Sequence, residues 1–495
     1  MTGDHARAVL DGLRAFYDAP SVAASATGEP TDGVDRALAL FGEAAVRVPA
    51  YRAFLTERGI DPEAVRTAAD FARLPLLTKD NYLRRYALPE LCRDGRLQDA
   101  ETVAVSSGSS GRPTVWPRTV LDELAVSRRF EHALYASFRA DERRTLVVVC
   151  FPLGSWVGGM YTAAACRHLA AKGYPLTVAT PGNNVEEILR VVTELGEHYD
   201  QVVLAGYPPF LKIVIDAGVA WERFAIRLLL AGEVFSETWR DLVGRRAGMT
   251  NPVADSVSLY GTADAGVLGN ETPLSVSVRR FLADRPEVAE ELFGTRRLPT
   301  LVQYDPADRF FETLEGTLVF TGNGSVPLVR YHIADDGGTV SYRSMMDFCR
   351  GHGFDPEAGR SEREAARLPF VYVFGRSLFA VSYFGANVYP ENVSGAVERD
   401  EVNAWVTGKF VVFVGPGPDG EPRLHVIVEI APGAEPPDGA TSLLADAVRS
   451  DLRRLNSEFA NYVPDRHQTP VVELRPAGDP EYFPVGVKHR YTRSS

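Results

Sequence analysis

From about residue 100, short β-branched runs alternate with helical stretches, and this rhythm limits the chain to few architectures. Runs such as TLVVVCF at 145–151 and QVVLAG at 201–206 have the length and composition of buried strands. Between them lies NNVEEILRVVTELGEHY at 183–199, whose apolar residues recur at helical spacing. Because successive strands joined by a helix run parallel, the sequence predicts an α/β fold around a largely parallel sheet.

Several predicted strands end in loops that are rich in glycine, serine or proline. In open α/β sheets, ligands bind in the crevice at the carboxyl ends of the strands. We therefore expect these loops to gather at one edge of the sheet and to form a ligand site there. The loops lie at 106–111, 152–159, 206–209, 232–233 and 260–266.

A chain of 495 residues is too long for one hydrophobic core, so we expect more than one domain. Residues 1–95 show mainly helical patterns, with Thr78 as the N-cap of one helix. These helices would belong to a large N-terminal domain at 1–375 that also contains the parallel-rich sheet. A hinge at 376–379 would then lead into a small α+β domain at 380–495.

Composition excludes several classes of protein. The net charge of −12, with no basic stripe, argues against a nucleic-acid partner. The four cysteines are scattered without metal-binding spacing, which predicts a reducing compartment and no zinc site. The N-terminus mixes charges, unlike a signal peptide, and the apolar run at 146–153 is too short for a bilayer. We expect a cytoplasmic protein without a membrane partner.

The stretch SSGSSGRPT at 106–114 has little side chain and many available backbone N–H groups. Successive N–H groups in such a loop form a concave anion site, and hydroxyl groups add donors to phosphate oxygens. The stretch is not a Walker loop, because no GK[ST] follows. Taken alone, the stretch fits an ordinary surface turn without a ligand as well as it fits a phosphate site.

Three further motifs follow this loop along the chain. They are SLYGTADAG at 258–266, VPLVRYHIADDGG at 326–338 and VFGRSLFAVSYFGANVYPENV at 373–393. With the loop, they resemble in order and spacing the motifs of the adenylate-forming superfamily, which includes acyl-coenzyme A synthetases, adenylation domains and luciferases. The forms RYHIADDGG and GANVYPENV are most similar to the phenylacetate-coenzyme A ligase branch. The resemblance extends from about residue 70 to the C-terminus.

The resemblance implies that the chain binds ATP and Mg²⁺. Asp335 would accept hydrogen bonds from the ribose, Arg376 would reach the nucleotide, and Asp264 would hold the metal ion. Lys488 matches the family's C-terminal lysine, which neutralises the α-phosphate during adenylation. Lys488, Arg376 and Asp264 are thus the implied catalytic residues. The other implied nucleotide-binding residues are Ser106, Ser107, Gly108, Ser109, Ser110, Gly111 and Thr114 at the phosphates, and Gly232, Glu233, Tyr260 and Gly261 at the adenine.

Each of these roles has a structural alternative. Asp335 could be an acid that only initiates the turn at 336–337, and Tyr260 an ordinary core residue. Arg376 could be a surface charge, and Lys488 could belong to a solvated tail. The four motifs in register favour the nucleotide-binding roles of Asp335 and Arg376, whereas both interpretations of Lys488 and of Tyr260 stay open.

The chain also departs from the family pattern. Arg112 replaces a lysine and keeps its charge, whereas Ala263 removes a hydroxyl group beside the predicted metal ligand. Asp264 is one methylene shorter than the usual glutamate, so it could reach Mg²⁺ through water. Leu378 stands in the hinge, where the family usually has a polar residue. This last change weakens the expectation that the second step forms a thioester.

The predicted substrate pocket is lined by aromatic side chains. Phe151, Trp156, Tyr161, Tyr207 and Phe210 supply flat apolar walls, which favour a planar aromatic acid. Some of them could instead be ordinary core residues.

Three functional hypotheses follow. In the first, the chain adenylates a small aromatic carboxylic acid and transfers it to an acceptor such as coenzyme A. In the second, favoured by Leu378 and Ala263, it belongs to secondary metabolism and forms an amide, loads a carrier protein, or activates nitrite as a diazotase acting on an aryl amine. The third is a non-catalytic nucleotide-binding homologue, against which the intact loop at 106–111 and Asp335 argue. The oligomeric state stays open, a dimer included.

Overall fold

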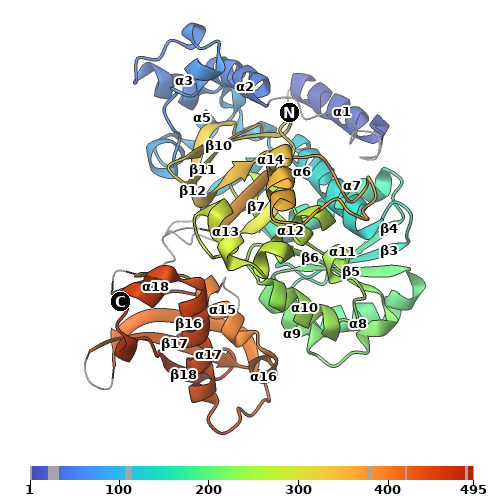
Figure 1. The fold of residues 1–495 in the computed structure, drawn as a ribbon. Coiled ribbons are helices and arrows are strands. Elements are labelled where there is room, and N and C mark those ends of the chain that lie inside the picture. Colours follow the sequence, from blue (N-terminus) through green and yellow to red (C-terminus); the bar gives the residue numbers. More distant parts are fainter. Residues whose placement is uncertain are drawn as a thin grey trace.

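The computed structural model describes residues 3–20, 33–105, 114–155, 157–375, 381–384, 386–417, 421–484 and 489–493. Its first hundred residues form small helices that pack against one end of a large sheet (Figure 1). Their apolar side chains, among them Phe41, Tyr51 and Phe54, share a buried cluster with Phe320 and Tyr331 of that sheet. The helices are α1 (Gly3–Asp18), α2 (Val34–Arg47), α3 (Pro49–Thr56), α4 (Ala68–Phe71) and α5 (Leu88–Leu91).

The large sheet has eleven strands in the order β10-β11-β12-β13-β9-β8-β7-β6-β5-β3-β4. Only the half from β4 to β7 is parallel, which departs from the largely parallel sheet predicted. Turns, instead of helices, join β7 to β8 and β10 to β11 to β12, so these strands run antiparallel. Strands β9 and β13 also pair antiparallel with their neighbours, although helices precede them in the chain. The strands are β3 (Thr145–Val149), β4 (Leu176–Ala179), β5 (Gln201–Gly206), β6 (Ile226–Ala231), β7 (Ser256–Thr262), β8 (Gly266–Asn270), β9 (Thr300–Gln303), β10 (Arg309–Leu314), β11 (Thr317–Gly322), β12 (Leu328–Val340) and β13 (Phe370–Gly375).

Helices cover both faces of the parallel half. Alternate residues point to opposite faces of a strand, so Val147 and Val149 of β3 join one apolar cluster and Leu146 and Val148 join another. α6 and α7 complete the first cluster, and α8, α9 and α10 complete the second. The helices of this region are α6 (Val120–Ala133), α7 (Val157–Ala171), α8 (Val185–Leu195), α9 (Pro208–Ile215), α10 (Glu237–Arg246), α11 (Pro252–Asp255), α12 (Pro273–Ala283), α13 (Pro286–Phe293) and α14 (Tyr342–Gly351).

The C-terminal part has its own apolar core, which includes Val426, Val428, Leu444 and Val448. It lies beside α9, α10 and α13 of the large part (Figure 1). This arrangement fits the predicted fold class, while the predicted domain limits stay a prediction because the hinge at 376–379 lies outside the described residues. Its elements are β14 (Val381–Tyr383), β15 (Ala386–Val388), α15 (Glu391–Val397), α16 (Asp400–Asn403), β16 (Val406–Pro416), β17 (Pro422–Ile430), α17 (Ala440–Leu455), α18 (Ser457–Tyr462) and β18 (Val471–Arg475).

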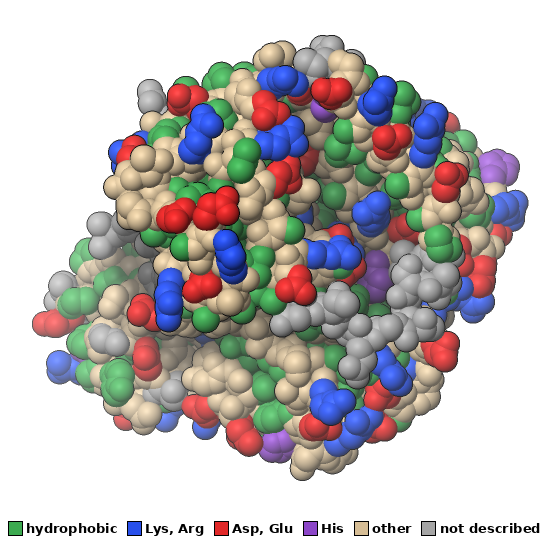
Figure 2. Space-filling view, turned by 90° about the horizontal axis from the view of Figure 1, so that it is seen from above, with side chains coloured by type: hydrophobic (Ala, Val, Ile, Leu, Met, Phe, Trp, Pro, Cys, Tyr) green, Lys and Arg blue, Asp and Glu red, His purple; other side chains and the backbone are tan. Residues whose placement is uncertain are grey.

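The surface charges and the thiols can be described directly. On the face in Figure 2, basic and acidic side chains are interspersed and gather into no extended basic area. Cys92, Cys150, Cys166 and Cys349 are all buried free thiols. Within the described residues, no helix is both long and apolar enough to cross a membrane.

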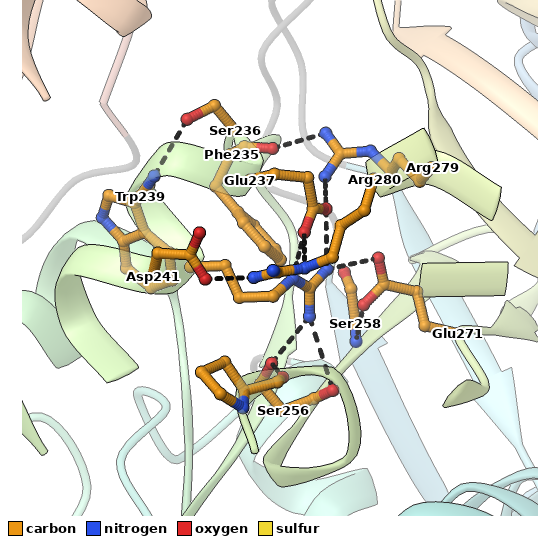
Figure 3. Close-up of polar contacts among 12 residues, drawn as sticks. Phe235, Ser236, Glu237, Trp239, Asp241, Ser256, Ser258, Glu271, Arg279 and Arg280 are labelled. Atoms are coloured by element: carbon orange, nitrogen blue, oxygen red, sulfur yellow. Dashed lines mark hydrogen bonds and ion pairs between the residues drawn. The ribbon is translucent and has the colours of Figure 1, made fainter. Parts of the chain in front are cut away.

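A buried ion-pair network ties α10 and α12 to the strands β7 and β8 (Figure 3). Arg240, which is 1% exposed, donates to Glu237 over 2.9 Å and to Glu271 over 2.7 Å. Glu271 also accepts the backbone N–H of Ser258 over 2.8 Å. Arg279 donates to Glu237 and, over 2.6 Å, to the carbonyl oxygen of Phe235. The network therefore fixes both the strands and the loop after β6.

Loss of the central guanidinium should destabilise the large part. Replacing Arg240 by Met leaves buried Glu271 without its ion-pair partner, and such a loss typically costs about 3–5 kcal/mol. We expect a clear fall in the urea concentration at the unfolding midpoint, monitored by tryptophan fluorescence. The matched control, Arg190→Met, removes an exposed guanidinium on α8 and should leave the midpoint unchanged. Equal urea midpoints for the two variants would contradict the stabilising role of the Arg240 ion pairs.

Candidate active site

The predicted phosphate loop connects two antiparallel strands, β1 (Thr102–Val105) and β2 (Val115–Arg118). The backbone N–H of Val105 donates to the carbonyl oxygen of Ser155 over 3.0 Å. Arg118 donates to the carbonyl oxygen of Ala263 over 2.5 Å. These two contacts place the strands β1 and β2 beside the predicted ligand loops at 152–159 and 260–266. Thr114 is half-buried before β2, whereas Ser106, Ser107, Gly108, Ser109, Ser110 and Gly111 lie outside the described residues, so the phosphate contacts stay a prediction.

Two tyrosine–aspartate pairs form the centre of the site. The Tyr260 hydroxyl of β7 donates to Asp335 Oδ2 of β12 over 2.7 Å. In the opposite direction, the Tyr331 hydroxyl of β12 donates to Asp264 Oδ2, which follows β7, also over 2.7 Å. All four side chains are buried. The structure thus brings together the predicted adenine residue, the predicted ribose acid and the predicted metal acid.

Strand β12 is distorted next to these acids. Ala334 has a positive φ of 61°, and the pairing of β12 with β13 shifts register between Asp336 and Gly337. Positive φ is costly for a residue with a side chain, and such strain clusters at functional sites. Against β11, the four steps of β12 from His332 to Asp336 match only two steps of the neighbouring strand, so Asp335 lies in an irregular stretch and its contact with Tyr260 does not follow from regular strand alternation.

A lysine that sequence reasoning missed completes the site. Lys79 Nζ lies 3.2 Å from Asp264 Oδ2. Thr78, the predicted N-cap, accepts the backbone N–H of Asn81 over 3.1 Å and so starts the short helical turn η3 (Lys79–Leu83). The preceding Leu77 is paired to β12, since the N–H of His332 donates to its carbonyl oxygen over 2.8 Å. The one sequence signal for this lysine was the N-cap at Thr78, which predicts the helical turn. It does not indicate that Lys79 lies beside Asp264.

Asp264 can take part in binding Mg²⁺ only together with other ligands. No group of three or more potential ligand side chains forms within the described residues. Its Oδ2 atom already faces both Tyr331 and Lys79, and the side chain is 4% exposed. Mg²⁺ typically uses one or two carboxylates and takes its remaining ligands from substrate phosphates and water. The role of Asp264 as a metal ligand therefore stays a prediction.

The loop after β6 brings the predicted Gly232 and Glu233 to the same region. Gly232 has a φ of 85°, and an added Cβ would lie 2.6 Å from Cε1 of Tyr207. Only glycine fits this position without displacing that ring. Glu233 accepts a hydrogen bond from the Tyr491 hydroxyl of the C-terminal part over 2.9 Å. Gly261 pairs with Val267 where β7 meets β8.

The predicted substrate pocket is only partly assembled. Phe151 and Tyr207 meet edge to face at 5.0 Å between ring centres, and Tyr161 belongs to the same apolar cluster. Phe210 packs in the cluster on the opposite face of the sheet. Trp156 lies outside the described residues, and the role of all five in substrate binding stays a prediction.

A small cavity adjoins Tyr161. Its wall includes Asp264 and two arginines, Arg118 and Arg309. Both guanidinium groups donate to backbone carbonyls of the turn after β7, Arg118 to Ala263 and Arg309 to Ala265. These arginines hold the turn that carries Asp264.

Several contacts seat the C-terminal part on α9, α10 and the loop before α10. Buried Lys212 donates to the carbonyl oxygen of Val406 over 3.1 Å. Ser236 donates to Glu398, and burial raises the pKa of Glu398 to about 8. Arg376, Leu378 and Lys488 lie outside the described residues, so their predicted roles stay predictions.

Comparison with known proteins identifies relatives. No protein-family model matches the chain. It is 23% identical over 360 residues to a phenylacetate-coenzyme A ligase of Aromatoleum evansii, covering 70% of each chain. It is 25% identical over 300 residues to that of Thermus thermophilus, covering 58% of this chain and 61% of that protein. A crystal structure of 2-hydroxyisobutyryl-coenzyme A ligase in the postadenylation state, in complex with R3-HIB-AMP, superposes with a TM-score of 0.64 at 14% identity, covering 94% of this chain and 91% of that chain. The predicted fold class is confirmed.

The seating of the C-terminal part should depend on pH through Glu398. Its folded-state pKa of about 8 lies above the ordinary value of 4.5, so the folded state binds the proton more tightly. The stability linked to this proton is complete below pH 4.5 and is lost as the pH rises to about 8. Between pH 6 and pH 9, the urea midpoint should therefore fall more in the wild type than in Glu398→Gln, whose side chain stays neutral. If the urea midpoints of the wild type and of Glu398→Gln fell equally with pH, the titration of Glu398 would not be the cause.

Proposed function

We propose that this chain, a relative of the phenylacetate-coenzyme A ligases with the fold of the adenylate-forming enzymes, activates a small carboxylic acid with ATP and transfers it to coenzyme A. The observation that carries the proposal is the pair of crossed contacts, Tyr260 to Asp335 and Tyr331 to Asp264. They join two acids that are 71 positions apart in the sequence (335 − 264) at one site. The relatives named phenylacetate-coenzyme A ligases support both the acid and the acceptor.

In this proposal, Asp335 binds the ribose. Its carboxylate accepts hydrogen bonds from the sugar hydroxyl groups, while the Tyr260 hydroxyl holds it in place. The ring of Tyr260 lies against the adenine. Mg²⁺, held by Asp264 together with phosphate oxygens, would supply further neutralisation of phosphate charge.

The chemical step is attack of the acid's carboxylate oxygen on the α-phosphorus of ATP. A new P–O bond forms, the bond to the bridging oxygen breaks, and pyrophosphate leaves with that electron pair. The protein contributes positioning and charge neutralisation. Lys79, beside Asp264, and the predicted Lys488 would supply positive charge at the reacting phosphate. The thiol of coenzyme A then attacks the acyl carbon, and AMP leaves.

An aromatic acid is the favoured substrate class. The edge-to-face contact of Phe151 with Tyr207 offers an aromatic wall next to Gly232. Aromatic pairs of this kind bind flat rings through offset or edge contacts.

A second candidate replaces coenzyme A by another acceptor. It rests on Leu378 in the predicted hinge and on Ala263 beside the predicted metal acid, both departures from the family pattern. In this version the acyl-adenylate passes to an amine or a carrier protein, or nitrite takes the place of the acid and the product diazotises an aryl amine.

Pyrophosphate release separates these possibilities. With ATP, Mg²⁺ and a panel of aryl acids, we expect pyrophosphate from the wild type and an acyl thioester when coenzyme A is added. Pyrophosphate without a thioester would favour the second candidate, to be checked with amines and nitrite. Absence of pyrophosphate under every condition would leave a non-catalytic nucleotide-binding protein.

Asp335→Asn tests the ribose contact. Loss of a charged acceptor should weaken ATP binding by about 10- to 100-fold, which corresponds to roughly 1.5–3 kcal/mol. Titration calorimetry with a non-hydrolysable ATP analogue measures this change. Asp347→Asn, an exposed acid on α14, serves as the matched control and should bind like the wild type. Unchanged affinity in Asp335→Asn would remove Asp335 from the nucleotide site.

A further inference from the structure

The C-terminal segment 489–493 is held by the small part and also touches the large part. The backbone N–H of Val412 in β16 donates to the carbonyl oxygen of Tyr491 over 2.7 Å, and that of Arg493 donates back to Val412 over 3.1 Å. The rings of Phe410 and Tyr491 pack with their centres 5.0 Å apart. The Tyr491 hydroxyl then reaches across to Glu233 over 2.9 Å. This segment therefore bridges β16 and the loop after β6.

The loop that receives Tyr491 is fixed from the side of the large part. Arg279 holds the carbonyl oxygen of Phe235 over 2.6 Å, and the Arg240 guanidinium lies 4.9 Å from the centre of the Phe235 ring. Tyr207 packs against Gly232 at the other end of the loop. Because the buried network of Figure 3 anchors this loop, Tyr491 contacts a rigid surface. Movement of the C-terminal part would have to break the hydrogen bond to Glu233.

The hydrogen bond between Tyr491 and Glu233 requires that the Tyr491 hydroxyl stays protonated. Burial, with Glu233 nearby, raises the pKa of Tyr491 well above its ordinary value. The phenol therefore remains a hydrogen-bond donor at any working pH, and the carboxylate of Glu233 accepts. Hydrogen bonds to a charged acceptor are stronger than neutral ones.

We propose that Tyr491 is a positioning residue for adenylation, because its hydrogen bond to Glu233 seats the C-terminal segment on the nucleotide loop during that step. The inference rests on the proposed function. Glu233 belongs to the predicted adenine region, and the predicted Lys488 precedes Tyr491 by three positions in the sequence. The segment so seated directly follows Lys488, the residue to which the family resemblance assigns a role in adenylation. Transfer of the acyl group to the acceptor does not require this contact.

The test separates the two steps of the reaction. In Tyr491→Phe, pyrophosphate formation at saturating ATP should fall about tenfold, since a hydrogen bond to a charged group is lost. Thioester formation from synthetic acyl-adenylate and coenzyme A should stay within about twofold of the wild type, a split that a general loss of structure would not produce. Hydrogen–deuterium exchange at 489–493 should increase. Tyr462→Phe, at an exposed tyrosine of α18, is the matched control and should change none of these.

A double-mutant cycle with Glu233→Ala, which removes the acceptor, identifies the partner. If the two groups act through their shared hydrogen bond, adding Tyr491→Phe to Glu233→Ala should slow adenylation little further. Equal slowing of both steps, or an unchanged adenylation rate despite increased exchange, would overturn the proposal. A wild type that forms no pyrophosphate with any acid would instead reject the proposed function itself.

Discussion

The guanidinium of Arg240 is the constraint on which the site's architecture depends. A charge buried to this degree must be paired, and its partners come from α10 and from the chain just after β8. Glu237 in turn holds Arg279, and Arg279 holds the loop after β6. One buried charge thereby locks two helices, the adjoining strands and the predicted nucleotide loop in a single arrangement. Buried ion pairs often contribute little net stability, so the value of this network lies in the geometry that it enforces.

The candidate site itself uses three separate parts of the chain. The helical N-terminal part supplies Lys79, and the large sheet supplies Asp264 and Asp335 with their two tyrosine partners. The C-terminal part supplies Tyr491. Each acid is buried, and each is stabilised by a phenol that is itself part of the apolar cluster shared with the N-terminal helices. Folding of the N-terminal helices onto β12 is therefore a condition for the site to form.

Much of the fold could be predicted from the sequence, because hydrophobic periodicity and capping act locally. The strands at 145–149 and 201–206, the helix at 185–195 and the cap at Thr78 follow from such patterns. The antiparallel half of the sheet could not be predicted in this way, because the direction of a strand depends on which segments pair and not on their composition. In the C-terminal part, the chain from 440 to 462 forms two helices instead of one, because Asn456 ends α17 and caps α18 by accepting the N–H of Phe459.

For the site, the motifs predicted which residues matter, but spatial contacts decided how they are arranged. No local pattern indicates that Tyr331 pairs with Asp264 or that Lys79 lies beside it, since these residues are distant in sequence. The irregular stretch of β12 from His332 to Asp336 likewise depends on pairing with β11. Phe210 is apolar and close in sequence to Tyr207, yet helix geometry turns it toward the other face of the sheet.

The burial of all four thiols has a practical consequence for studying motion. Burial raises the pKa of Cys92 to about 11 and that of Cys166 and Cys349 to about 12, and it raises the pKa of Cys150 as well. Alkylating reagents attack the exposed thiolate, so the native protein should resist maleimide dyes. Cysteines introduced on exposed surfaces of α8 and α17 would then accept a donor and an acceptor fluorophore without removal of native thiols. Energy transfer between them would report whether the C-terminal part moves relative to the large sheet when ATP is added.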